Sequence, residues 1–137
     1  GEKDDNSKFI PFAIENILKD RKIKATKGKQ KRDFLYVKDA ARAYMRVLDK
    51  LAYLKHGFLQ FDIGTGRTLS LKFMLNTIER ISGKEAKIEW GAMPYRKNEV
   101  FDCKLDTDKA RRILDWQPQT SLEEGIKNTI SWYKERK

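Results

Sequence analysis

KGKQKRDFLYVKDAARAY, residues 27–44, runs from a basic segment through an alternating apolar stretch into a helical pattern, with no proline or glycine between the last two. The DFLYV portion predicts a short strand at 33–37, because alternating apolar residues suit a half-buried strand. The spacing that follows predicts a helix over 39–54, and Asp39 suits the first turn of a helix. Arg32 therefore stands directly before a strand, where the backbone would hold it firmly.

The rest of the chain continues this alternation of helices and short strands. Further helices are predicted over 7–20, 71–82, 108–116 and 121–137, and further strands over 22–26, 57–63 and 87–93. Capping signals mark several helix ends: Ser70, Gly83, Thr107, and Ser121 with Glu124. The alternation predicts an α/β fold. Strands this few and short leave unpaired edges, so we expect partner strands from a second copy or from polypeptide outside this sequence.

Composition narrows the class of protein. The chain has 137 residues and a mass of 16.1 kDa, which suits a single domain. No segment is apolar over the roughly 18–20 residues that cross a membrane. Cys103 is the only cysteine, so a reducing compartment such as the cytoplasm is expected. The only histidine, His56, is interpreted as a surface residue at a helix end, and no metal-ligand spacing is present.

The formal charge of +10 favours partners that carry phosphate. Seven basic residues lie between positions 21 and 32: Arg21, Lys22, Lys24, Lys27, Lys29, Lys31 and Arg32. Lysines along a strand also keep an exposed edge soluble and unpaired. A solvated edge and a phosphate-facing surface both stay open, and a basic nucleic-acid-binding module is an alternative function.

Conventional catalytic patterns are incomplete in this chain. Gly64-Thr65-Gly66 resembles part of a dinucleotide-binding loop, but Leu69 stands where the third glycine is required, so a tight turn is preferred. Tyr133 and Lys137 have the spacing of a dehydrogenase Tyr-x-x-x-Lys pair, but they lie at the end of the sequence without an accompanying serine or glycine-rich loop. With one histidine, no Ser-His-Asp or Cys-His arrangement can be assembled. We therefore predict no catalytic residue here.

Arginines remain as candidates for a binding role. A guanidinium is a planar fork that matches two phosphate oxygens and keeps its charge at any relevant pH. Arg32 precedes a strand, and Arg96 lies in the loop MPYRKNEV. Brought together in one pocket, the two would clamp a diphosphate.

Four stretches of this sequence resemble a known family. They resemble the C-terminal half of the NAD(P)-dependent nucleotide-sugar epimerases and dehydratases, which are extended short-chain dehydrogenases. In chain order the four stretches are GEKDDNSKFIPFAI, RDFLYVKDAARAYMRVLDK, FDIGTGRTLSLKFMLNTI and DTDKARRILDWQPQTSLEEGIKNTISWYKE. The resemblance implies that residues 1–137 form a substrate-binding lobe with late strands and helices of a Rossmann sheet. It implies that the N-terminal Rossmann portion, with its catalytic and cofactor-binding residues, is absent from this sequence. The stretch FLQFDIG would then be one strand of that sheet.

The same resemblance implies roles for individual residues. In the family, an arginine before Asp-Phe/Tyr and a second arginine in an Arg-Pro-Gly-Asp/Glu motif hold the diphosphate, and the acidic residue contacts the ribose. The positions implied as substrate-binding are Arg32, Arg96 and Glu99, with Phe9 and Thr26 at the base pocket. Two departures stand out, since Lys97-Asn98 replaces Pro-Gly, and Thr26-Lys27 replaces the usual aromatic before Gly28.

Partners and cofactors follow from the resemblance in the same way. It implies a nucleotide-diphosphate sugar as ligand, and NAD or NADP in the full-length protein with none bound by this chain alone. It also implies a homodimer, and neither a membrane nor nucleic acid as partner. The reaction would be an epimerisation, dehydration or reduction, and the wording TKGKQKRDF is similar to the branch that makes deoxysugars for bacterial surface polysaccharide. A stand-alone, non-catalytic binding protein is the remaining alternative.

Overall fold

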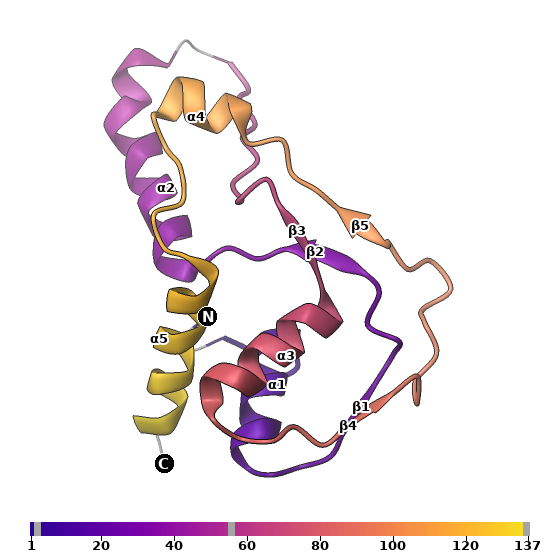
Figure 1. Ribbon diagram of the computed structural model, residues 1–137. Helices are drawn as coiled ribbons and strands as arrows, with labels where there is room; N and C mark the ends of the chain where they lie inside the picture. Colours follow the sequence, from indigo (N-terminus) through magenta and orange to yellow (C-terminus); the bar gives the residue numbers. More distant parts are fainter. Residues whose placement is uncertain (2–3, 55–56, 136–137) are drawn as a thin grey trace.

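The structure is a computed structural model that describes residues 1, 4–54 and 57–135 (Figure 1). His56 and Lys137, which the sequence singles out, lie outside these residues. The helices are α1 (Phe9–Leu18), α2 (Val37–Lys50), α3 (Leu71–Ser82), α4 (Asp108–Leu114) and α5 (Leu122–Glu135), with a 3-10 turn η1 (Leu51–Tyr53). The strands are β1 (Ile23–Ala25), β2 (Lys31–Asp33), β3 (Thr68–Ser70), β4 (Ile88–Trp90) and β5 (Asp102–Cys103).

The helices pack in two groups (Figure 1). α2 and α4 pack together at one end of the molecule, and α1, α3 and α5 pack together at the other. The strands β2, β3 and β5 lie between these groups. None of the helices formed by residues 1, 4–54 and 57–135 is long and apolar enough to cross a bilayer.

Most helix ends follow the predicted caps. Ser70 Oγ accepts a hydrogen bond from Phe73 N at 3.1 Å at the start of α3, and Gly83 ends that helix in the left-handed region, at φ 70°. Ser121 Oγ accepts from Glu124 N at 3.2 Å before α5. These bonds satisfy backbone groups that a helix leaves unpaired at its ends. The predicted capping roles of these three residues are confirmed.

The starts of α4 and α2 differ from prediction. Thr107 occupies the N-cap position of α4, but its side chain makes no capping bond. Asp106 Oδ1 instead accepts from Asp108 N at 3.1 Å, because an Asp side chain readily bonds to the backbone two residues later. α2 begins at Val37, two residues before Asp39, which therefore lies inside the first turn.

The strands form two small sheets. β1 pairs with β4 in parallel, and β2 lies between β3, which is antiparallel to it, and β5, which is parallel. The strands predicted at 22–26 and 87–93 are confirmed as β1 and β4. β3 and β5 were not predicted, because strands of two or three residues carry no clear alternation.

Two strand predictions are wrong. The strand expected at 33–37 lies instead at Lys31–Asp33, because β3 and β5 pair only with that part of the segment, and Val37 already belongs to α2. Segment 57–63 forms no strand, since no other segment of the described chain pairs with it. A strand requires a hydrogen-bonding neighbour. Phe58 in this segment is 89% exposed.

The larger hydrophobic core lies among α1, α3 and α5, with β1 and β4 along its side. Its fully buried members repeat at helical spacing on each helix, as expected for helices that present one apolar face. They include Ala13, Ile14 and Ile17 of α1, Met74, Leu75 and Ile78 of α3, and Ile126 and Ile130 of α5. Each large side chain of this kind contributes roughly 1.5–3 kcal/mol when it is fully buried.

The smaller core joins α2 to α4. Ala43, Ala110, Leu114 and Trp116 are buried there, and partly buried side chains that include Phe61 pack against them. Segment 57–63 therefore contributes to packing although it forms no strand.

The opposite side of α2 is apolar but exposed. Tyr44, Leu48 and Leu51 follow one another at helical spacing and are 75%, 58% and 56% exposed. Apolar residues scattered singly over a surface are ordinary, whereas a continuous row marks an interaction surface. We name Tyr44 and Leu48, together with Leu51 at the start of η1, the outer face of α2.

A buried carboxylate connects α2 to the segment that leads into α5. Asp39 is 0% exposed, and its two oxygens accept from Gln119 N at 2.9 Å and Thr120 N at 3.1 Å. Arg42 Nη2 also donates to this carboxylate, and Trp116 Nε1 donates to the Asp39 carbonyl oxygen at 3.2 Å. Burial raises the pKa of Asp39, but the hydrogen bonds from Gln119 and Thr120 outweigh burial and hold the pKa below its ordinary value.

Replacing Ile14 by Ala tests the larger core. Ile14 is 0% exposed, so we expect the free energy of unfolding to fall by about 2–4 kcal/mol, measured by urea denaturation. Ile113→Ala is the matched control, because Ile113 is 38% exposed, and its loss should stay below about 1 kcal/mol. Equal losses at the two positions would contradict the assignment of the core.

Asp39→Asn tests the buried carboxylate through pH. Because folding lowers the pKa of Asp39, its contribution to stability is fully present above the ordinary carboxylate pKa of about 4 and is lost as the pH falls through the lower folded value. At pH 7 we expect Asp39→Asn to reduce the free energy of unfolding by about 1–3 kcal/mol, since the amide group faces backbone donors. The difference between the two proteins should shrink at acid pH. Asp49→Asn, at an exposed position of α2, is the matched control and should change the free energy of unfolding at pH 7 by less than about 0.5 kcal/mol.

Candidate functional site

β2 holds Arg32 beside the loop that follows β4. Arg32 Nη1 donates to Lys31 O at 2.7 Å and to Val100 O at 2.6 Å, and Nη2 donates to Glu99 Oε1 at 2.6 Å. The Arg32 side chain is 33% exposed and that of Glu99 only 11%. The two residues are 67 positions apart in the sequence, so the fold alone brings them together.

Arg96 lies in the same loop but outside this contact. It is exposed, and Glu99 N donates to Arg96 O at 3.1 Å, so a turn connects the two residues. Within residues 1, 4–54 and 57–135, the Arg96 side chain forms no hydrogen bond or ion pair. The structure thus brings Arg32 and Glu99 together and leaves the second guanidinium free in solvent.

The loop over 94–101 is fastened to the segment around β2. Tyr95 Oη accepts from Lys29 N at 3.3 Å, and Phe101 O accepts from Lys31 N at 2.7 Å. The rings of Tyr95 and Phe101 meet edge to face with 5.0 Å between their centroids. These contacts hold Glu99 next to Arg32 from both sides of the loop.

Phe9 and Thr26, the residues expected at the base pocket, lie in other surroundings. Phe9 begins α1 and packs on the Phe34 ring at 6.2 Å between centroids, beside the larger core. Thr26 follows β1, and its Oγ1 accepts from Gly28 N at 3.2 Å and from Gln30 Nε2 at 3.1 Å. Neither residue forms a hydrogen bond with the Arg32–Glu99 pair.

Asp33 fastens the Gly64-Thr65-Gly66 turn to β2. Its carboxylate accepts from Thr65 N at 2.9 and 3.0 Å, from Gly66 N at 2.8 Å and from Thr65 Oγ1 at 2.7 Å. A side chain at Gly64 would come within 2.8 Å of Asp33 Oδ2 and 2.6 Å of Leu105, and Gly66 has φ +71°. The glycines thus allow a close approach and a left-handed turn. The amides that could cradle a phosphate already bond to Asp33, which favours the turn over the dinucleotide loop.

Sequence reasoning missed this role of Asp33. Successive side chains of a strand point to opposite faces. Arg32 can therefore reach the loop on one face of β2 while Asp33 reaches the turn on the other. The Arg-Asp pair at the start of the predicted strand was the available signal, since successive residues of a strand face opposite sides.

The basic run is partly neutralised. Three of its members have acidic partners on neighbouring strands or loops, namely Lys22 with Glu89, Lys31 with Asp102 at 3.7 Å, and Arg32 with Glu99 at 2.6 Å. A surface that binds nucleic acid through its charge needs its lysines available to phosphates. These pairs favour a structural role for part of the run.

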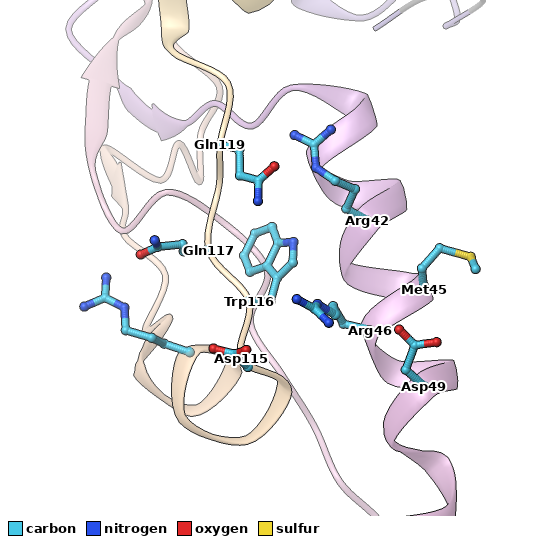
Figure 2. Close-up of a pocket in the computed structure, with 9 residues that line it drawn as sticks. Arg42, Met45, Arg46, Asp49, Asp115, Trp116, Gln117 and Gln119 are labelled. Atoms are coloured by element: carbon cyan, nitrogen blue, oxygen red, sulfur yellow. The ribbon is translucent and has the colours of Figure 1, made fainter.

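A groove of about 540 Å³ lies between α2 and the segment after α4 (Figure 2). Its charged lining consists of Arg42, Arg46, Arg111, Asp49 and Asp115. Arg42 is paired with the buried Asp39, and the other two arginines are balanced by two aspartates. The groove therefore offers no surplus of positive charge to a diphosphate.

A second groove, of about 550 Å³, lies between the start of α2 and helices α3 and α5. Mostly apolar side chains such as Val37, Met74 and Leu122 line it, with Arg67 and Arg111 among them. The five predicted substrate-binding residues line neither groove. In the described residues no three His, Cys, Asp or Glu side chains are placed to hold a metal ion. Arg32 and Glu99 form an ion pair at 2.6 Å, and Cys103 lies opposite Arg32 in the pairing of β2 with β5.

Known proteins similar to this chain act on nucleotide-linked sugars. A family model described as GDP-mannose 4,6 dehydratase matches residues 3–129. The chain is 31% identical over 131 residues to CDP-abequose synthase of Salmonella muenchen, a match that covers 96% of this chain and 44% of that protein.

Solved structures show the same fold. UDP-glucose 4-epimerase of Thermotoga maritima, solved with UDP-glucose, has a TM-score of 0.87 and 28% identity over 99% of this chain and 43% of its own. The dTDP-glucose 4,6-dehydratase of Bacillus anthracis, solved with NAD, has a TM-score of 0.78 and 25% identity over 95% of this chain and 40% of its own. The predicted α/β class is confirmed as the fold of extended short-chain epimerases and dehydratases. The chain spans about two fifths of the length of these relatives.

Asp33→Ala tests the link between β2 and the turn. Three donors at residues 65 and 66 lose their acceptor, so we expect the free energy of unfolding to fall by about 1–3 kcal/mol in urea denaturation. Asp102→Ala is the control, because its one ion pair spans 3.7 Å at an exposed position and should change stability by less than about 0.5 kcal/mol. Similar losses for both variants would rule out a special role for Asp33.

Proposed function

Because the chain belongs to the GDP-mannose 4,6 dehydratase family, we propose that it is the substrate-binding part of an NAD(P)-dependent nucleotide-sugar epimerase, dehydratase or reductase. In this proposal residues 1–137 form one nucleotide-sugar-binding unit, the C-terminal portion of a larger enzyme. The relatives named above, whose names include CDP-, UDP- and dTDP-linked sugars, support a nucleotide-diphosphate sugar as the ligand class.

One observation carries the proposal: β2 presents the Arg32 guanidinium to an anion. The backbone of Arg32 is fixed between two other strands, and its side chain is bonded to a carboxylate at 2.6 Å. A phosphate oxygen is an acceptor of the same charge and similar geometry for this planar fork. In this proposal Arg32 anchors a diphosphate, and anchoring orients the sugar for reaction.

Arg96 supplies the second guanidinium in this proposal. It is exposed on the loop that also carries Glu99, so it can reach a ligand bound at Arg32 when the loop rearranges. Phe9 and Thr26 are proposed at the edge of the base pocket.

The cofactor is proposed to bind in the remainder of the larger enzyme. NAD or NADP supplies hydride transfer to and from the sugar when it is bound. The Gly64-Thr65-Gly66 turn does not fit a dinucleotide pyrophosphate, because Asp33 occupies its amide donors. This chain's contribution is to bind and orient the substrate.

The outer face of α2 is proposed as the surface that packs on that remainder. Its three apolar side chains are more than half exposed, and Phe58 in the adjoining segment is 89% exposed. The chain covers only 40–44% of the compared relatives, so their other parts are large enough to bury this surface. We place the whole enzyme in the cytoplasm as a homodimer.

Arg32→Ala tests the anchoring role. In titration calorimetry of the intact protein with UDP-, dTDP-, CDP- and GDP-sugars, we expect the sugar that binds to lose about 2–4 kcal/mol of binding free energy. Arg21→Ala is the matched control, since it removes the same charge from an exposed part of the basic run and should leave binding unchanged.

Two outcomes would contradict this proposal. Unchanged affinity of Arg32→Ala for every one of these sugars would remove Arg32 from the site. Tight binding to random-sequence DNA that weakens steeply with salt, and weakens equally in Arg21→Ala and Arg32→Ala, would favour the nucleic-acid-binding alternative.

A further inference from the structure

In the ligand-free protein, the anion-binding end of Arg32 is already occupied. Three of the five N–H donors of its guanidinium are engaged, two at Nη1 by the carbonyl oxygens of Lys31 and Val100 and one at Nη2 by Glu99. All three acceptors lie 2.6–2.7 Å from their donor nitrogens. At the Nη1–Nη2 end of the guanidinium, the Glu99 carboxylate therefore already occupies the position that a diphosphate would take.

Glu99 is held in this position by its surroundings. Its side chain is only 11% exposed, so the carboxylate is largely removed from water. Two hydrogen bonds hold the loop that carries Glu99. Before Glu99, Tyr95 Oη accepts from Lys29 N, and after it, Phe101 O accepts from Lys31 N. The pair differs in this from a mobile surface ion pair, whose two side chains lose freedom for little gain.

A carboxylate and a phosphate compete for the same donors. Both are anions that accept charge-assisted hydrogen bonds from a guanidinium, and a given N–H can be donated to only one of them at full strength. Two like charges side by side at one guanidinium also repel each other. A diphosphate that binds the Nη1–Nη2 end of the guanidinium therefore has to displace the Glu99 carboxylate.

We propose that Glu99 is an internal stand-in for the ligand's diphosphate, and that substrate binding proceeds by exchange of one anion for the other at Arg32. This inference rests on the proposed function and adds a mode of regulation to that site. Exchange releases Glu99 from Arg32, and the bond from Glu99 N to Arg96 O transmits this movement to the second guanidinium. The exposed position of Arg96 is then a property of the empty state.

The exchange predicts that removing Glu99 raises the affinity for a diphosphate, whereas a simple binding contact predicts no such gain. If Glu99 only bonds to the ribose, its removal weakens every ligand that has a ribose and leaves a bare diphosphate unaffected. If Glu99 competes for Arg32, its removal strengthens the binding of a bare diphosphate. Inorganic pyrophosphate has the diphosphate without the ribose and so separates the two roles.

The test is titration calorimetry of the intact protein with inorganic pyrophosphate. We expect Glu99→Gln to bind it roughly tenfold more tightly than the unmodified protein, because a neutral amide competes less well than a carboxylate. Glu99→Ala, which removes the competing oxygen, should tighten binding at least as much. Glu89→Gln is the matched control. It makes the same change in net charge, but Glu89 lies in β4 of the other sheet and pairs with Lys22, so affinity should change less than twofold. Thermal unfolding of each variant confirms that it is folded.

The outcomes separate this inference from the proposed function. Pyrophosphate affinity that is unchanged or lower in both Glu99 variants, or pyrophosphate binding by none of the proteins, overturns the exchange. An equal gain in Glu89→Gln also overturns it, since the gain would then come from net charge alone. Failure of every nucleotide sugar to bind the unmodified protein would instead contradict the proposed function. Nucleotide-sugar binding that requires Arg32, without the pyrophosphate gain, leaves the proposed function intact and removes only the exchange.

Discussion

The buried carboxylate of Asp39 is the constraint on which the arrangement of the chain depends. A charge removed from water is costly unless hydrogen bonds replace its hydration. Here backbone amides of Gln119 and Thr120 supply them, so the first turn of α2 must lie against the segment that leads into α5. Among the residues that the structure describes, the core between α2 and α4 has only four buried members. Hydrogen bonding rather than apolar area therefore sets how the smaller group of helices joins the larger one.

Six residues earlier, Asp33 applies the same principle to β2. Its carboxylate accepts from the amides of residues 65 and 66, which ties β2 to the turn before β3. Three-residue strands contribute few backbone hydrogen bonds. Side-chain acceptors such as the Asp33 carboxylate therefore supply part of the hydrogen bonding that holds β2 in place. Arg32 lies next to Asp33 in β2, between β3 and β5, and is consequently presented from a rigid element, although the sheet around it is small. Rigid presentation is what a residue needs in order to orient a ligand.

The sequence predicted local features well and non-local ones poorly. The caps at Ser70, Gly83 and Ser121 involve bonds within three or four residues, so the local pattern was sufficient. The boundaries of β2 depend on where β3 and β5 pair, and segment 57–63 lacks a partner strand altogether. Alternation of apolar residues indicates that a segment can form a strand. Whether it does depends on hydrogen bonding to a neighbouring strand.

The candidate site shows the same division. The resemblance predicted one site with Arg32 from the Arg-Asp-Phe motif and Glu99 from the later Arg-Lys-Asn-Glu stretch, but no local pattern indicates that a carboxylate 67 residues away occupies the guanidinium. The position of Arg96 in solvent is equally invisible in the sequence, because it depends on the state of the loop. Thr26 bonds to Gln30 four positions away, whereas Phe9 packs on the distant Phe34, a contact that no local pattern indicates.

Charge explains why an empty diphosphate site would contain an acidic residue. Arg32 stands in a run of basic residues on a chain of net charge +10, and a half-buried guanidinium without an anion would be repelled by its neighbours and poorly hydrated. Glu99 offsets that charge while no ligand is present. A diphosphate carries more negative charge than one carboxylate and can engage two guanidiniums, so it displaces Glu99 although it must first break an ion pair. Because this ion pair breaks when the ligand binds and re-forms when it leaves, it lowers the net affinity for substrate and product alike.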